Sequence, residues 1–198
     1  MFFIDIVFCF LISNTSRILG NNKKVGQNAL YLVGILFGLM NGATRPIWGY
    51  LMDKFSFKIL MFIISFIELG VSATIYYFAG NPFIFVLENI LVACCLSGAT
   101  LFIPLFHKIF GKDYGAQLYG ITGFSIGLAS LVGPLLIKIL VNEDKDYLTV
   151  YLIGGSLCFI KTLALICFKE NKPYIYENRN NSEKDEKVSF TRTSKEII

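Results

Sequence analysis

The sequence is short of charged residues. Only 16% of its 198 residues are Asp, Glu, Lys or Arg, whereas a water-soluble domain carries about a quarter. The shortage is uneven, because the last 30 residues hold seven of the eighteen basic and six of the fourteen acidic side chains. Residues 1–168 are therefore apolar almost throughout, which excludes a soluble enzyme and a nucleic-acid-binding protein.

The sequence also lacks the residue groups that bind metals or perform covalent chemistry. It has a single histidine, His107, which we expect to be solvated in a loop. No cysteine stands at metal-ligand spacing from another cysteine or from the histidine, and no phosphate-binding loop or nucleophile with an adjacent base is visible. We therefore expect no enzymatic activity, no metal and no cofactor. The net charge of +4 is too small and too scattered to indicate a nucleic-acid partner.

Long apolar runs are what the sequence has in abundance. A helix of about 20 mostly apolar residues crosses the ~30 Å hydrocarbon layer of a membrane. Six runs qualify: residues 1–19, 29–52, 59–79, 83–106, 114–137 and 147–168. They predict an all-α, multi-pass integral membrane protein that spans the lipid bilayer six times.

The polar segments between these runs are predicted to be links and a tail. Residues 107–113 are expected to join the fourth and fifth spans, and residues 142–146 the fifth and sixth. Residues 169–198 mix charges of both signs with Asn and Ser, so we predict a disordered tail. The basic residues of the short links favour the cytoplasmic side for this tail.

Arg45 is the most informative residue of the chain. It lies about 12 Å along a helix from Asp53, which we expect at the membrane interface. An arginine inside the hydrocarbon costs at least ~2.5–3.5 kcal/mol, so it should face a cavity or a partner. Its planar guanidinium is suited to hold a carboxylate bidentately. Arg45 therefore either binds a substrate carboxylate or forms an internal ion pair with Glu68 or Glu88.

The residues around Arg45 favour close approach by another helix. Gly34, Gly38 and Gly42 recur every four residues and form one small-residue stripe. Asn41 lies one helical turn before Arg45 and shares its side of the helix, so it contacts the substrate or holds the arginine in place.

Two acids lie inside predicted spans. Glu68 and Glu88 are each a candidate for a proton site or for an ion pair, because an intramembrane acid is costly without such a role. Asp5 is too close to the start of the chain to interpret. Lys161 lies eight residues before Lys169, and we expect it to snorkel towards the interface.

Two segments resemble carriers of the major facilitator superfamily. The run from Asn41 to Lys54, NGATRPIWGYLMDK, resembles the eighth helix and following loop of that superfamily, and most closely the monocarboxylate transporter and oxalate–formate exchanger branch. The resemblance implies that Arg45 is the substrate-carboxylate arginine. It also implies a cytoplasmic gating loop formed by Gly49, Asp53, Lys54 and Lys58.

A second segment is similar to the tenth and eleventh helices of the same branch. The similarity is carried by Gly98, Phe102, Pro104, Phe110, Gly111, Gly115, Tyr119, Gly120, Gly133 and Pro134. Together the two segments cover roughly residues 29–137. They imply the C-terminal half of a twelve-helix carrier, with a missing N-terminal six-helix half as its partner. We interpret the chain first as a fragment or truncated gene product, and second as a half-size protein that needs a partner.

The resemblance implies secondary transport of a small organic anion. The sequence departs from this branch at two places, and each limits the expected function. Residues 114–137 carry no charge, which favours a substrate with a single negative charge. Asn41 stands where monocarboxylate carriers have an acid, which puts proton coupling at that position in doubt. The alternatives are a non-transporting membrane remnant, an accessory or scaffold subunit, or a carrier for another solute such as an amino acid or a sugar.

The glycines also predict which helices face the missing half. The fifth span contains Gly115, Gly120, Gly123, Gly127 and Gly133, and glycines let another backbone approach closely. We therefore expect the second and fifth spans to face the missing half, with Arg45 pointing into an open concave face.

Overall fold

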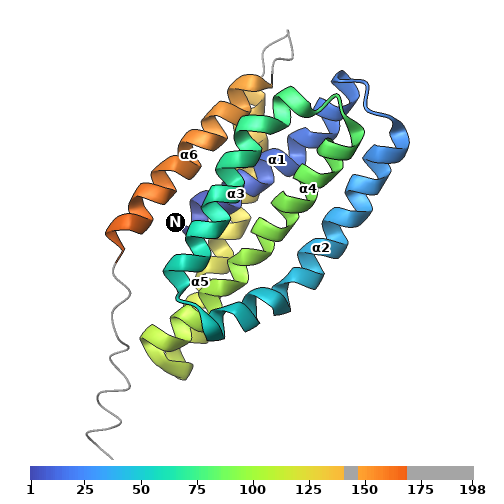
Figure 1. Ribbon diagram of the computed structural model, residues 1–198. Coiled ribbons are helices and arrows are strands. Elements are labelled where there is room, and N and C mark those ends of the chain that lie inside the picture. The colour runs from blue at the N-terminus through green and yellow to red at the C-terminus, as the bar shows by residue number, and fades with distance from the viewer. Residues whose placement is uncertain (141–146, 169–198) are drawn as a thin grey trace, which may run out of the picture.

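The computed structural model describes residues 1–140 and 147–168, except for the side chains of residues 111–116, 121 and 140. All regular structure in this part of the chain is helical (Figure 1). The helices are α1 (Phe2–Asn22), α2 (Gln27–Lys54), α3 (Phe57–Phe78), α4 (Pro82–Ser97), the short 3₁₀ helix η1 (Gly98–Leu101), α5 (Phe102–Leu140) and α6 (Leu148–Cys167). The link at 142–146 and the tail at 169–198 lie outside the described residues.

Six candidate membrane spans occur in the described residues, as the sequence predicted. Their helices are long and apolar enough to cross a bilayer. The chain is therefore an integral, multi-pass membrane protein with an all-α fold.

The residues expected to link the fourth and fifth spans, 107–113, are helical rather than a loop. The fourth span runs over Pro82–Phe110 and the fifth over Gln117–Ile139. The chain departs from α-helical geometry before these residues, in the 3₁₀ helix η1 that precedes α5. Pro104 does not break α5, because it is the third residue of that helix, where backbone N–H groups have no intrahelical acceptor. A few polar side chains do not end a helix without a proline or a run of turn residues.

The other helix junctions follow ordinary capping chemistry. Ser56 precedes α3, and its hydroxyl accepts a hydrogen bond from the backbone N–H of Ile59 at 3.4 Å. Asn81 caps α4 through its side-chain oxygen, which accepts from the N–H groups of Phe83 and Ile84. Pro82 follows at the first helical position, which favours proline. These caps fix where α3 and α4 begin and hold the turns between neighbouring helices short.

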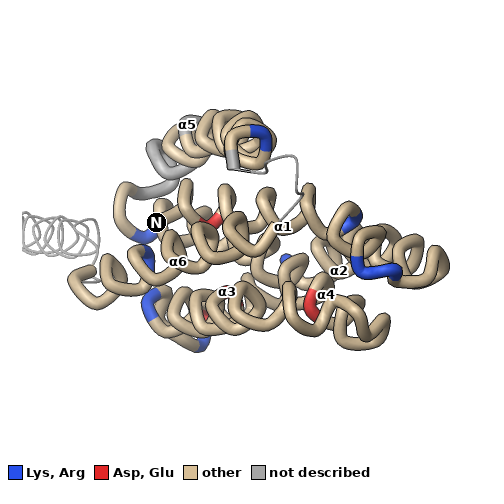
Figure 2. The backbone as a smooth tube through the Cα atoms, turned by 90° about the horizontal axis from the view of Figure 1, so that it is seen from above, with Lys and Arg blue, Asp and Glu red and all other residues tan. Residues whose placement is uncertain are grey.

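The helix α1 is the centre of the bundle. It packs against α4, α5 and α6, while α3 packs against α4 and α6 (Figure 2). The helix α2 contacts mainly α4 and forms one edge of the bundle, with α6 at the opposite edge in Figure 1. The spans differ in how much of their most apolar 18-residue stretch is buried by the rest of the bundle. The buried share is 61% in α1, but only 17% in α2 and 12% in Gln117–Ile139. These two spans are therefore the least covered of the six candidate spans in the described residues.

Aromatic rings from α1, α3 and α5 and from the end of α6 pack against one another at one end of the bundle. Phe102 meets Phe2 and Phe57 edge-on, with ring centroids 4.8 and 5.0 Å apart. Phe57 also meets Phe168 at 6.0 Å. Such edge-to-face pairs contribute beyond their buried area, and here they join the first turns of α1, α3 and α5 to the end of α6.

Candidate functional site

The orientation of α2 is fixed by polar contacts to α4. The hydroxyls of Thr44 and Ser97 lie 2.6 Å apart, and the indole N–H of Trp48 donates to the backbone carbonyl of Cys94 at 2.9 Å. Thr44 and Trp48 are one turn apart, so they share the face of α2 that packs on the bundle. Arg45 follows Thr44 directly and therefore turns away from this packed face.

Arg45 is exposed, and among the described residues it makes no ion pair or hydrogen bond. The alternative in which Arg45 pairs with Glu68 or Glu88 is therefore wrong in this structure. Both acids have other partners on other helices. The guanidinium lies well inside a membrane span, where an unpaired charge is costly unless water or a ligand reaches it.

Asn41 lies one turn before Arg45 and is partly buried. Its side-chain oxygen is shielded from solvent and has no hydrogen-bond partner. The glycines beside it face open space: a Cβ added at Gly38, Gly42 or Gly49 would meet nothing within 4 Å. The side of α2 that carries Arg45 is thus smooth and uncovered.

The fifth span shows the same property. A Cβ at Gly120, Gly123 or Gly127 would also meet nothing within 4 Å. Gly133 differs, because Asn14 and Phe10 of α1 lie beside it. The surroundings of Gly115 lie outside the described part of the chain. The glycines named here on α2 and α5, apart from Gly115 and Gly133, thus face open space in this structure. That these spans face a missing half stays a prediction.

A concave site that the sequence did not predict lies between α1 and α2. It encloses about 450 Å³. Its polar lining comes from Ser13, Ser16, Arg17, Gln27 and Tyr31. These residues come from the last turns of α1 and the first turns of α2, and the short segment 23–26 joins the two helices. Arg45 and Asn41 are not among its lining residues.

Lys54 and Lys58 of the predicted gating loop contact different helices. Gly49 and Asp53 are exposed on the last turns of α2. Lys54 places its ammonium 4.5 Å from the ring centroid of Tyr50 on the same helix. Lys58 instead donates to the backbone carbonyls of Ile166 and Phe168, at 2.9 and 3.0 Å. It thereby satisfies carbonyls at the end of α6, which a helix leaves without partners.

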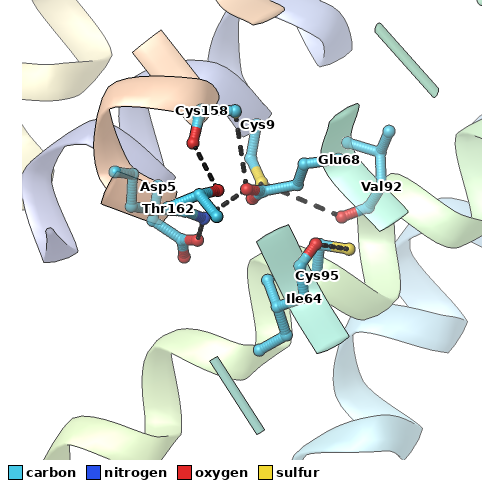
Figure 3. A network of polar contacts seen from close by, with 9 residues as sticks. Asp5, Cys9, Ile64, Glu68, Val92, Cys95, Cys158 and Thr162 are labelled. Atoms are coloured by element: carbon cyan, nitrogen blue, oxygen red, sulfur yellow. Dashed lines mark hydrogen bonds and ion pairs between the residues drawn. The ribbon is translucent and has the colours of Figure 1, made fainter. Parts of the chain in front are cut away.

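A buried charge cluster joins three helices (Figure 3). The ammonium of Lys161 on α6 donates to Asp5 Oδ1 of α1 at 2.5 Å, and also to Glu68 Oε2 of α3. All three side chains have no solvent exposure. The thiols of Cys9 and Cys158 donate to the two oxygens of Glu68 at 3.7 and 3.5 Å. We name Asp5, Glu68 and Lys161 the Lys161 cluster.

The expectation that Lys161 snorkels to the interface is wrong. Snorkelling places the charged head in water, but two carboxylates inside the bundle hold this ammonium away from it. Asp5, which the sequence left uninterpreted, is one of the two. The partners are 156 and 93 residues from Lys161 along the chain, so only the helix packing reveals them.

Glu88 occupies a different environment, between α3 and α4. The hydroxyl of Thr74 donates to its Oε1 at 2.6 Å, and its Oε2 is buried without a hydrogen-bond partner. An apolar groove of about 450 Å³ borders this carboxyl, and Phe66, Ile67 and Leu91 contribute to its walls. Glu88 is only 5% exposed, so it is not a freely solvated acid.

Comparison with known proteins gives the family of the chain. The sequence profile of the Major Facilitator Superfamily matches residues 1–196. No curated protein matches the chain at a significant level. The profile covers all six helices, and superfamily membership indicates membrane transport rather than enzymatic catalysis. On the length of this match, the chain belongs to the Major Facilitator Superfamily.

Proposed function

We propose that the chain forms one half of a secondary transporter for small organic monoanions, and that Arg45 binds the substrate carboxylate. The observation that carries the proposal is an arginine in the middle of a span that no acid of the described residues neutralises. An anionic substrate supplies the missing charge. A guanidinium holds a carboxylate through two parallel hydrogen bonds, which adds geometric selectivity to the charge attraction.

Asn41 supports this site by its position. Its side-chain oxygen accepts hydrogen bonds and is left without a donor. An acceptor one turn from a guanidinium is suited to orient one of its N–H groups, and the NH2 group of the same amide can donate to a carboxylate. We therefore propose that Asn41 either positions Arg45 or contacts the anion directly.

The second part of the proposal concerns a partner half that packs on the exposed surfaces of α2 and α5. In twelve-helix carriers the substrate site lies between two six-helix halves. The small-residue stripe around Gly38 and Gly42 and the exposed fifth span fit such a contact. We propose that a second six-helix half covers this face and that Gly49, Asp53 and Lys54 at its cytoplasmic end contribute to gating.

Uptake of labelled formate, lactate and pyruvate into proteoliposomes tests the proposal. Arg45→Lys keeps the charge but loses the bidentate fork, so we expect at least ~10-fold slower uptake, which corresponds to ~1.4 kcal/mol of lost transition-state stabilisation. Lys138→Gln is the matched control, because it removes an exposed charge from α5, and its uptake should equal that of the parent chain.

Thermal unfolding of the same samples separates binding from transport. A ligand that binds the folded chain raises its melting temperature. Stabilisation by these anions without uptake would support an Arg45 site that needs its partner half. Neither stabilisation nor uptake would overturn the anion assignment, in favour of another solute or a non-transporting subunit. Normal uptake by Arg45→Lys would overturn the site.

A further inference from the structure

We propose that Asp5 and Glu68 together bind one proton inside the transmembrane bundle, so that the Lys161 cluster carries no net charge. The cluster lies on α1, α3 and α6, away from the open face of α2 that carries Arg45. The proposal therefore holds whatever solute the protein transports, and its test does not require transport.

The charge count of the cluster is the first argument. Lys161 is the only cation within ion-pair distance of either acid among the described residues. With all three groups ionised, the cluster would carry one net negative charge at zero solvent exposure. A buried charge without a partner is strongly unfavourable, and two carboxylates that share a site resist ionising together. One bound proton removes the excess charge.

The hydrogen bonds of the two acids are the second argument. Both oxygens of Glu68 receive donors, from Cys9, Cys158 and Lys161. Asp5 receives only the Lys161 ammonium, and its Oδ2 is buried without any partner. An ionised oxygen with no donor is costly to bury. Figure 3 shows the side chains of Asp5 and Glu68 directed towards the same point between the helices.

The other groups that face the cluster do not supply a compensating charge at ion-pair distance. The thiols of Cys9, Cys95 and Cys158 are hydrogen-bond donors here. The α-amino group of Met1 interacts with Asp5 electrostatically but forms no ion pair with it. The free N–H groups of the first turn of α1 also lie near Asp5 and favour its ionised form. For coupled groups of this kind the proton belongs to the pair rather than to one residue.

The burial of the cluster predicts how this proton behaves. No atom of the three side chains is open to solvent, so exchange with water requires α1, α3 and α6 to separate. The proton should therefore stay bound while the external pH changes. The cluster then serves as a neutral link between three helices.

Infrared spectroscopy of the purified chain in micelles of an ester-free detergent tests the proposal, because a protonated carboxyl has a C=O band that a carboxylate lacks. The parent for all samples carries Glu88→Gln, which removes the other buried acid. In mildly alkaline buffer we expect one such band in the parent and its loss in both Asp5→Asn and Glu68→Gln. Each single variant leaves one acid with one lysine, which needs no proton.

Two further variants keep the test decisive. Asp5→Asn combined with Lys161→Met leaves Glu68 without a cation, so the band should return. An N-terminal extension moves the α-amino group of Met1 away, and the parent band should remain. Absence of the band in the parent, or its retention in either single variant, would overturn the proposal. If a variant fails to fold, the parent spectrum still tests the proposal, because the absence of the band overturns it.

Discussion

Lys161 and Arg45 are both basic residues deep in apolar helices, yet their surroundings are opposite. Lys161 has no solvent exposure and contacts two acids from two other helices. Arg45 is exposed and has no acidic partner among the described residues. The ammonium of Lys161 therefore has its counter-charges within the fold, whereas the proposed function assigns the counter-charge of Arg45 to a substrate. An intramembrane charge therefore indicates a ligand site only after the packing has shown that no side chain already neutralises it.

The helices that carry these residues differ in the same way. The Lys161 cluster joins α1, α3 and α6 at the interior of the bundle, whereas Arg45 lies on α2, which contacts mainly α4. Lys161 thus lies in the packed interior of the bundle, and Arg45 lies on an exposed face. The proposed function requires both, because a carrier built of two halves needs a packed bundle and a face that its other half can cover.

The largest expected effect comes from removing the buried cation. Lys161→Met leaves Asp5 and Glu68 without a counter-charge, and breaking a buried pair in this way costs about 3–5 kcal/mol. Equilibrium unfolding in mixed detergent micelles measures the free energy. Lys138→Met, on an exposed part of α5, is the control and should change stability by less than ~0.5 kcal/mol. Equal effects of the two variants would remove the distinction between buried and exposed charges.

Glycine substitutions sharpen the comparison between packed and open surfaces. A Cβ at Gly98 would overlap the Cδ1 atom of Ile64, which is fully buried, whereas a Cβ at Gly42 meets nothing within 4 Å. Overpacking of a core costs about 1–3 kcal/mol, so Gly98→Ala should be destabilising by that amount. Gly42→Ala should be neutral or stabilise the chain by up to ~1 kcal/mol, because alanine is the better helix former. The same unfolding assay measures both, and a destabilising Gly42→Ala would show that this face is packed.

The sequence predicted the spans but not the pairing between them. Hydropathy along the chain is a local property, and six apolar runs therefore became six candidate spans. The partner of a buried charge depends on which helices are neighbours and how each is rotated. Lys161 has no acid within helical reach on α6, and its partners come from α1 and α3. Its interpretation as a snorkelling residue failed for that reason.

The candidate site shows the same limit. Arg45 stood out because an arginine is rare in an apolar run, which is visible without a structure. Its lack of an acidic partner became visible only when Glu68 was found with Lys161 and Glu88 with Thr74. The concave site around Arg17 was missed because α1 and α2 each contribute only part of its lining.

A smaller effect is expected at the contact that orients α2. Trp48→Phe keeps the ring but loses the hydrogen bond from the indole N–H to the carbonyl of Cys94, which should cost about 0.5–1.5 kcal/mol. Tyr50→Phe, on an exposed part of the same helix, is the control and should cost less than ~0.5 kcal/mol. If both variants unfold like the parent, α2 is not held by this contact, and the argument for the direction of Arg45 weakens.

The smallest effect on stability is expected at Arg45 itself, where Arg45→Met removes the charge but keeps an apolar side chain of similar length. Because Arg45 has no partner among the described residues, its removal breaks no ion pair, and the free energy of unfolding should change by less than ~0.5 kcal/mol. A cost of several kcal/mol, like that of Lys161→Met, would mean that Arg45 is neutralised inside the fold and is a structural residue. An unchanged stability together with lost stabilisation by formate or lactate would separate the two basic residues by function: one holds the helices together, and the other is kept for the substrate.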